Sequence, residues 1–245
     1  MNIEITIPVL NEEATLYNQI KKVDHFLDEN LYDFKVDILI ADNGSSDQTR
    51  YIAEQLAEEI PRVKYKRLEE KGVGRALKAS WKNSEADIVG YMDLDLATDL
   101  KHLKPALNRL IQSDADIVTG TRLAKGSSVS GRKPVRKITS LGLNSLIKVF
   151  FRVKFTDGMC GFKFIKREHV NRIIECGAQS DGWFFATELL IVGEHLNLKV
   201  HDLPVNWRDD PSSKVKIITL AMEYLRAMVS LRKKLKTTQC YDKNV

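Results

Sequence analysis

Two aspartates, Asp93 and Asp95, stand two residues apart directly after a short apolar run at 88–92. Such a run is typical of a buried strand, and carboxylates at its end can face a cleft. Paired carboxylates are hard oxygen ligands, so they could hold a divalent cation that bridges a diphosphate. A solvated turn or a helix cap would carry the same residues. The position at a strand end favours the metal site, with Mg²⁺ or Mn²⁺ as the cofactor.

Two more carboxylates, Glu12 and Asp42, follow the first two apolar runs of the chain. A carboxylate placed there can accept hydrogen bonds from ribose hydroxyls or from a base N–H, and it could equally cap a helix. The turn 71–75 (Lys-Gly-Val-Gly-Arg) opens a predicted helix, where backbone N–H groups can approach a phosphate or a ribose. It lacks the spacing of a P-loop, so by itself it indicates a nucleotide site only weakly.

The segment 122–154 is basic throughout, with nine Lys or Arg residues and no Asp or Glu. A solvated surface usually mixes the two signs, so a one-sign segment beside a predicted metal site indicates a channel for phosphate groups. Nucleic acid is the rival anion. Against it, the nearby aromatic residues Phe150, Phe151 and Phe155 are placed like core residues and are not interleaved on a surface. We therefore expect no nucleic-acid partner.

These residues need a scaffold that brings them together, and the first half of the sequence alternates strand and helix patterns. Strands are predicted at 3–7, 36–41, 63–65, 88–92 and 115–119, and helices at 12–29, 73–83 and 103–111. The alternation predicts an α/β fold with a mostly parallel sheet and helices on both faces. Ligands bind beyond the carboxyl ends of such strands, so the polar clusters that follow 9, 41, 92 and 119 should share one rim.

The second half of the chain is less regular. Residues 122–136 have a loop-like composition, and further elements are predicted as helices at 137–151 and 187–196 and strands at 161–165 and 200–205. The stretch 215–236 predicts one long helix with a wide apolar stripe and a basic end. A basic amphipathic helix suits docking on an anionic membrane surface, and packing against the domain explains the same pattern equally well.

The composition bounds the class of protein. The chain has 245 residues, 43% of them hydrophobic and 29% charged, so we expect one folded domain with an appendage. The net charge of +5 favours anionic partners. We find neither a signal peptide nor the ~18–20 successive apolar residues that span a membrane. These features predict a cytoplasmic protein that is peripheral on the inner face of the cell membrane, and they leave homo-oligomerisation open.

Taken in order, the motifs resemble a known family. They read Ile-Pro-Val-Leu-Asn-Glu-Glu at 7–13, Ala-Asp-Asn-Gly-Ser-Ser-Asp-Gln-Thr at 41–49, Lys-Gly-Val-Gly-Arg-Ala at 71–76, Met-Asp-Leu-Asp-Leu-Ala-Thr-Asp at 92–99 and Gly-Thr-Arg at 120–122. This set is similar to family 2 glycosyltransferases with the GT-A fold. Two later stretches, 157–163 and 204–208, narrow the resemblance to dolichyl- and polyprenyl-phosphate sugar synthases. The resemblance covers about residues 2–214, so we expect a GT-A glycosyltransferase domain at 1–213, followed by the amphipathic basic helix at 214–236 and a tail at 237–245.

The resemblance also implies roles for single residues. The metal would be held by Asp95 and Asp93. The nucleotide part of a nucleotide-sugar donor would be bound by Pro8, Glu12, Asp42, Lys71, Asp93, Arg208, Ser213 and Lys214, and its sugar by Asp157, Lys163 and Glu188. The phosphate of a polyprenyl-phosphate acceptor would be received by Arg122, Arg132 and Arg136. Catalysis would depend on Asp93, Asp95, Arg122 and Arg136.

These implied roles describe an inverting hexosyltransferase. A phosphate acceptor is largely ionised near neutral pH, so it needs no strong base, and positive groups would offset the charge on the leaving diphosphate. A UDP-glucose-like donor is favoured, with GDP-mannose as the other choice. The alternatives are a family 2 transferase acting on a sugar or polymer hydroxyl and a non-catalytic member that binds nucleotide or lipid. Two positions depart from relatives: Ala97 replaces a Gln of the mannose synthases, and Ala186 replaces an Asp common beside Gly-Trp-Phe-Phe.

Overall fold

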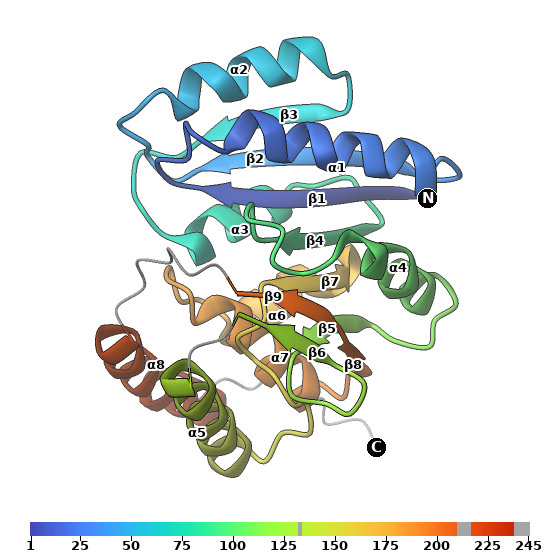
Figure 1. Cartoon of the computed structure of the whole chain (residues 1–245). Helices are drawn as coiled ribbons and strands as arrows, with labels where there is room; N and C mark the ends of the chain where they lie inside the picture. Colours follow the sequence, from blue (N-terminus) through green and yellow to red (C-terminus); the bar gives the residue numbers. More distant parts are fainter. Residues whose placement is uncertain (132–133, 210–216, 238–245) are drawn as a thin grey trace.

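The computed structural model describes residues 1–131, 134–209 and 217–237. Its centre is a seven-stranded sheet with the strand order β3-β2-β1-β4-β7-β5-β8. The strands are β1 (Asn2–Val9), β2 (Lys35–Asp42), β3 (Val63–Arg67), β4 (Ile88–Met92), β5 (Ile117–Thr121), β7 (Phe162–Lys166) and β8 (Val200–Pro204). Every neighbouring pair is parallel except the two that include β7. The predicted α/β fold with a mostly parallel sheet is therefore confirmed (Figure 1).

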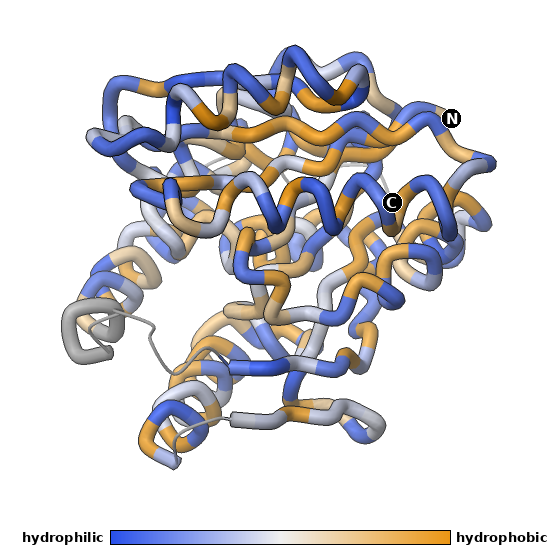
Figure 2. The backbone as a smooth tube through the Cα atoms, turned by 45° about the horizontal axis from the view of Figure 1, so that its top comes forward, coloured by the Kyte–Doolittle hydropathy of each residue, from blue (hydrophilic) through white to orange (hydrophobic). Residues whose placement is uncertain are grey.

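Helices cover both faces of the sheet and bury two separate apolar clusters. One face carries α1 (Leu16–Asn30), α2 (Thr49–Glu59) and α4 (Leu103–Ile111). The other face carries α3 (Val73–Trp81), α5 (Pro134–Phe151), α6 (Val170–Glu175), α7 (Phe185–His195) and α8 (Ile217–Thr237). A strand covered on both sides should be apolar throughout, and every residue of β4 and β5 is buried. Figure 2 shows the same contrast, with mostly orange central strands and helices that alternate between blue and orange.

Several element boundaries differ from the sequence prediction for local reasons. β1 continues through Pro8 to Val9. The last residue pair between β1 and β4 is Thr6↔Tyr91, so Pro8 has no partner in β4 and its missing N–H costs no hydrogen bond on that side. β3 extends to Arg67, two residues beyond the predicted end. α5 begins at Pro134, since a proline suits the first turn of a helix, where its missing N–H would have no partner.

A small two-stranded sheet lies in the region predicted as a loop. β6 (Ser128–Ser130) pairs in parallel with β9 (Asn206–Arg208), and Trp207 of β9 also bridges to Thr98 in the loop after β4. The backbone N–H of Arg208 donates to the carbonyl of Ala97 at 2.8 Å. The chain that follows β8 is thereby held beside the two aspartates that follow β4.

The long C-terminal helix packs against the domain along its inner face. Tyr224, Met228 and Leu231 of α8 are buried, and the Tyr224 ring centroid lies 4.9 Å from that of Phe184 in an edge-to-face arrangement. Of the two explanations for its apolar stripe, packing therefore accounts for this inner face. Within the described part of the chain, no helix is long and apolar enough to cross a bilayer.

Candidate active site

The strand register brings the predicted rim together. Val9 at the end of β1 is opposite Asp42 of β2, and Asp42 is opposite Arg67 of β3. β4 and β5 end one residue before Asp93 and Arg122. β7 runs antiparallel to both of them, so the residues just before it, 157–161, return to the same edge. Six chain segments that are distant in sequence thus meet at the carboxyl ends of the parallel strands, where α/β sheets bind ligands.

One end of the rim is organised around Asp42, whose side chain is fully buried. Its carboxylate accepts hydrogen bonds from the Ser45 N–H at 2.8 Å, the Tyr65 hydroxyl at 2.9 Å and the Arg67 guanidinium at 3.1 Å. Burial together with Asp42 raises the pKa of Tyr65 to about 12, so its hydroxyl stays a donor. Tyr65 and Arg67 were not among the predicted site residues. The pattern that could have revealed them is the polar end of β3, which was predicted to stop at Tyr65.

The loops after β1 and β2 are tied to each other beside Asp42. The Asn11 N–H donates to Ser45 Oγ at 3.0 Å, and the Glu12 N–H donates to Thr49 Oγ1 at 2.7 Å. Asn11 has a φ of 56°, a left-handed conformation that asparagine tolerates better than most residues. The half-buried Glu12 carboxylate accepts from the Thr15 hydroxyl at 2.8 Å. The predicted nucleoside residues Glu12 and Asp42 thus lie in two interlocked loops.

Two further residues that were predicted to bind the nucleotide-sugar border this end of the rim. Pro8 is half-buried and lies in register with Ala41, one residue before Asp42. Lys71 is exposed and precedes Gly72, whose φ is 149°. A side chain at Gly72 would meet the backbone carbonyl of Asp181, so glycine is required for this close approach. The turn therefore brings Lys71 to the start of α3 in one fixed backbone conformation.

Asp93 and Asp95 lie at the centre of the rim. Asp93 is half-buried and Asp95 is exposed, with the Asp95 carboxylate accepting from the Ala97 N–H at 3.0 Å. The Asp93 side chain rests on Gly161, and any side chain at that glycine would occupy the space of the carboxylate. Burial and the negative charge of Asp95 raise the pKa of Asp93 to about 7, against the opposing influence of Lys163 and Arg122. Asp93 therefore keeps a proton to a higher pH than an ordinary aspartate does.

The two carboxylates suit a divalent cation whose remaining ligands come from the substrate and from water. Two adjacent carboxylates of which one is exposed are oxygen ligands of the kind that Mg²⁺ and Mn²⁺ prefer. Among the residues that the structure describes, no group of three or more His, Cys, Asp or Glu side chains could enclose a metal ion. A cation at Asp93 and Asp95 would therefore take its remaining ligands from water and from a bound diphosphate, as Mg²⁺ commonly does.

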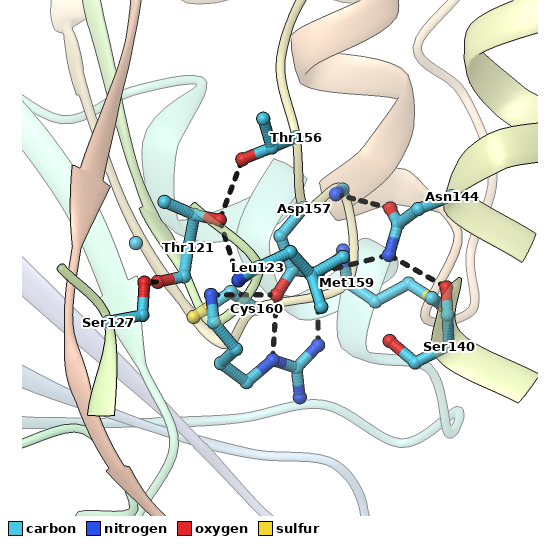
Figure 3. Close-up of polar contacts among 12 residues, drawn as sticks. Thr121, Leu123, Ser127, Ser140, Asn144, Thr156, Asp157, Met159 and Cys160 are labelled. Carbon is cyan, nitrogen blue, oxygen red and sulfur yellow. Dashed lines mark hydrogen bonds and ion pairs between the residues drawn. The ribbon is translucent and has the colours of Figure 1, made fainter. Parts of the chain in front are cut away.

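Beside the carboxylates, Arg122 forms a buried ion pair with Asp157. Nε of Arg122 lies 2.7 Å from Oδ2 of Asp157, Nη2 lies 3.0 Å from Oδ1, and the Arg122 backbone N–H also donates to Oδ2. The side-chain N–H of Asn144 in α5 donates a hydrogen bond to the Asp157 carboxylate, and the Asn144 side-chain oxygen accepts one from the Gly158 N–H (Figure 3). The side chain of Asp157 is fully buried and that of Arg122 is 9% exposed. This network joins β5, α5 and the loop before β7.

The Arg122–Asp157 pair stays charged because each partner supports the other. Burial opposes ionisation of Asp157, yet Arg122 outweighs it and lowers the pKa of the carboxyl. Burial likewise opposes the charge on Arg122, yet Asp157 outweighs it and raises the pKa of the guanidinium. The guanidinium also lies over the Trp207 ring, 4.7 Å from its centroid. Arg122 therefore has two nitrogens committed inside the protein, and Asn144 and Trp207 are site residues that sequence reasoning missed.

The remaining predicted residues that the structure describes each have a defined local partner or position. Lys163 is buried, and its ammonium group donates a hydrogen bond to the Cys160 carbonyl. Burial lowers the pKa of Lys163. Arg136 of α5 pairs with Asp209 at 3.1 Å, directly after the exposed Arg208. Glu188 is buried on α7 and accepts hydrogen bonds from the backbone N–H and the hydroxyl of Ser180. Outside the described residues lie Arg132, Ser213 and Lys214.

The two positions that depart from relatives are both buried. Ala97 is 5% exposed and lies between Asp95, which binds its N–H, and Arg208, which binds its carbonyl. Ala186 is 5% exposed in the first turn of α7, within the second apolar cluster. A carboxylate at Ala186 would therefore be placed among apolar side chains.

The mostly parallel sheet, with a carboxylate pair after β4 and the buried Asp42 at the end of β2, is an α/β fold of the GT-A-like class. The chain belongs to glycosyl transferase family 2, which residues 4–174 match. It is therefore a glycosyltransferase, as the sequence motifs predicted.

The chain is similar in sequence to known glycosyltransferases and similar in fold to a solved synthase structure. Glycosyltransferase AglD of Haloferax volcanii is 28% identical over 219 residues, which cover 89% of this chain and 35% of AglD. The dolichyl-phosphate beta-glucosyltransferase ALG5D of Trichomonas vaginalis is 27% identical over 242 residues, covering 94% of this chain and 74% of ALG5D. The crystal structure of glucosyl-3-phosphoglycerate synthase from Mycobacterium tuberculosis, in complex with Mn²⁺, UDP and glucosyl-3-phosphoglycerate, superposes with a TM-score of 0.68 at 18% identity, covering 97% and 81% of the two chains. That likeness shows the shared fold.

Proposed function

We propose that this glycosyltransferase moves a hexose, with inversion, from a UDP-sugar to a polyprenyl phosphate on the inner face of the cell membrane. The observation that carries the proposal is the carboxylate pair Asp93 and Asp95 beside Arg122 and Lys163 on one rim. Opposite charges placed side by side can hold a cation with its diphosphate and a second anion at the same time. That is the electrostatic requirement for joining a phosphate acceptor to a nucleotide-sugar.

The donor end of the proposed site is the group of residues around Asp42. Asp42 fixes Tyr65 and Arg67, the interlocked loops fix Glu12, and Pro8 is held in β1 beside Ala41, so a nucleoside would meet groups that are already oriented. We favour a UDP-sugar, and UDP-glucose first, because ALG5D is named a dolichyl-phosphate beta-glucosyltransferase and the mycobacterial synthase was crystallised with UDP. GDP-mannose remains the donor to test beside it.

The metal ligands in this proposal are Asp95 and Asp93. A divalent cation bound there would supply positive charge that offsets the charge on the departing diphosphate. Both Mn²⁺ and Mg²⁺ accompany UDP in structures of the mycobacterial synthase. Asp93 is held in place by Gly161 and by its own backbone N–H, which donates to the Gly161 carbonyl at 3.2 Å. Arg208 and Lys71 would approach the diphosphate from the two sides of the rim.

The acceptor end of the proposed site is the basic side of the rim. An acceptor phosphate would lie against Arg136 and the remaining N–H groups of Arg122, with Arg132 as a further expected contact. Its oxygen attacks the anomeric carbon from the side opposite the leaving diphosphate. The new C–O bond forms as the bond to UDP breaks, and the configuration inverts. The nucleophile is already ionised, so the reaction needs no carboxylate at Ala186.

The experiment that tests this proposal compares donors and acceptors directly. Labelled UDP-glucose, UDP-N-acetylglucosamine or GDP-mannose would be incubated with the protein, Mn²⁺ and detergent-dispersed undecaprenyl phosphate, and label extracted into organic solvent would be counted. We expect label from one donor and its loss with EDTA. Transfer to a free sugar or polymer hydroxyl in place of the lipid phosphate would establish the alternative acceptor class. Donor binding without any transfer would favour a non-catalytic member.

A further inference from the structure

Helix α5 has an unusual distribution of side chains. Its inner side carries Ser140, Asn144, Ile147 and Phe151, which are all buried. Two of these four are polar, and Asn144 supports the active-site network: it bonds to Asp157 and to the Gly158 N–H, and its side-chain N–H also donates to the backbone carbonyl of Ser140 (Figure 3). An ordinary surface helix would place such residues outward and apolar residues inward.

The outer side of the same helix is apolar. Val135, Ile138 and Val149 are 64%, 70% and 79% exposed, and the span of 14 residues from Val135 to Val149 is about four helical turns, so they lie along one line. Leu141 and Leu146 flank that line and are also exposed. Single exposed apolar residues are common, whereas several on one face of a helix, here with the exposed Gly142 and Ser145 between them, indicate an interaction surface.

Helix α8 is a neighbour of α5 and also exposes apolar side chains. It lies beside α5 (Figure 1), where the Arg232 guanidinium bonds to the Phe150 carbonyl and lies 4.6 Å from the Phe150 ring centroid. While its inner side is buried, α8 exposes Met222, Leu225 and Val229. The apolar face of α5 and the exposed face of α8 together form what we call the α5–α8 surface.

The charges around the α5–α8 surface select its partner. α5 contains no acidic residue and α8 contains one, Glu223. The basic side chains of the two helices are Arg136, Lys137, Lys148, Arg226, Arg232, Lys233, Lys234 and Lys236. A second copy of the chain would bring the same positive charge against this surface, which disfavours self-association through it. An apolar stripe with basic flanks complements an anionic lipid bilayer, where the apolar side chains enter the interface and the basic ones meet lipid phosphates.

We propose that the α5–α8 surface seats the enzyme on an anionic bilayer, with the outer stripe of α5 as its principal contact. This inference rests on the proposed function, because a lipid-borne acceptor is the reason for the enzyme to bind a membrane. Arg136, in the first turns of α5, pairs with Asp209 next to Arg208, so the end of this surface adjoins the rim. Seating α5 on the bilayer would present the active site at the depth of the lipid phosphates. Asn144, on the opposite side of the same helix, would link that seating to the Arg122–Asp157 pair.

The test is sedimentation of the full chain with vesicles of about three parts phosphatidylcholine to one part phosphatidylglycerol. The variant is Ile138→Glu with Val149→Glu, and the matched control is Tyr32→Glu, which adds a charge at a residue 73% exposed in the loop between α1 and β2. We expect the wild type and the control to bind, and the double variant to bind at least about tenfold more weakly. Wild-type binding should also weaken with salt and with vesicles of phosphatidylcholine alone.

Three results would overturn the proposal: no sedimentation of the wild type, equal binding by the double variant, or concentration-dependent dimers that the double variant abolishes without any vesicle binding. If the glutamates lower the melting temperature, Ile138→Gln with Val149→Gln removes the apolar stripe with a good helix former. Transfer to a short, water-soluble prenyl phosphate separates the two proposals. The double variant should retain it, whereas vesicle binding without any such transfer in the wild type would contradict the proposed function and leave the surface standing.

Discussion

Replacing Asp157 by Asn should destabilise the protein far more than an ordinary charge neutralisation. The Asp157 carboxylate is fully buried and accepts from Arg122 through Nε, Nη2 and the backbone, as well as from Asn144 and the Met159 N–H. The substitution would leave the Arg122 guanidinium buried without a counter-charge. Breaking a buried pair from one side costs about 3–5 kcal/mol in the free energy of unfolding. For a chain of this size that corresponds to a melting temperature lower by roughly 6–20 °C.

The assay is urea unfolding at neutral pH, followed by circular dichroism, with Asp114→Asn as the matched control. Asp114 pairs with Arg109 at the same kind of distance, 3.1 Å, but both side chains are 49% exposed, so its loss should cost less than about 1 kcal/mol. The reasoning would be refuted if Asp157→Asn unfolded within about 1 kcal/mol of the wild type.

The same pair predicts a pH dependence with a definite sign. Arg122 holds the pKa of folded Asp157 below its ordinary value of about 3.9, so the carboxylate contributes stability that is fully present above that pH. This contribution is lost as the pH falls through the folded pKa. The difference in unfolding free energy between the wild type and Asp157→Asn should therefore shrink below about pH 4. A difference that stayed constant from pH 7 to about pH 3 would show that the cost has another origin.

Three further substitutions test the rim. Gly161→Ala should displace the Asp93 carboxylate, a movable side chain, and so lower kcat by about tenfold or more with a nearly unchanged melting temperature. The control is Gly142→Ala, where an added methyl group meets open space. Equal activity of the two variants would contradict the placement of Asp93. Asp42→Ala should weaken UDP binding in calorimetry by about tenfold or more, and an unchanged Kd would show that Asp42 does not belong to the donor site. Asp95→Asn should raise the Mn²⁺ concentration needed for half-maximal transfer by about tenfold or more; an unchanged metal titration would mean that the ligands lie elsewhere.

The fold was predictable because the strands are buried on both faces. Continuous apolar runs such as 88–92 have few alternatives to a central strand, and α4 was predicted with its observed ends, Leu103 and Ile111. Boundaries shifted where a local rule depended on a neighbour. Pro8 stays in β1 because β4 has already ended, which only the register reveals. β6 was hidden because its three residues are held by β9, far along the chain.

The site was predictable where a residue follows a strand and was not where it acts through a partner. Asp42, Asp93 and Arg122 could be placed on one rim from strand ends alone. Asn144 could have been noticed as an amide within a predicted helix, but its bond to Asp157 depends on the packing of α5. Trp207 belonged to a quoted motif, yet its stacking on Arg122 is a tertiary contact. The stripe on α5 was overlooked because an apolar helical pattern in a sequence does not say which side faces the core.

The central claim is that the rim transfers a hexose to a phosphate with inversion, and the most direct measurement is the structure of the product. Unlabelled UDP-glucose and a short prenyl phosphate would be incubated with the enzyme and Mn²⁺, and the product examined by phosphorus and proton NMR. The account predicts a phosphodiester at the anomeric carbon with the β configuration, inverted from the α donor. An α-linked product, or glucose on a hydroxyl while the prenyl phosphate remains a monoester, would contradict it.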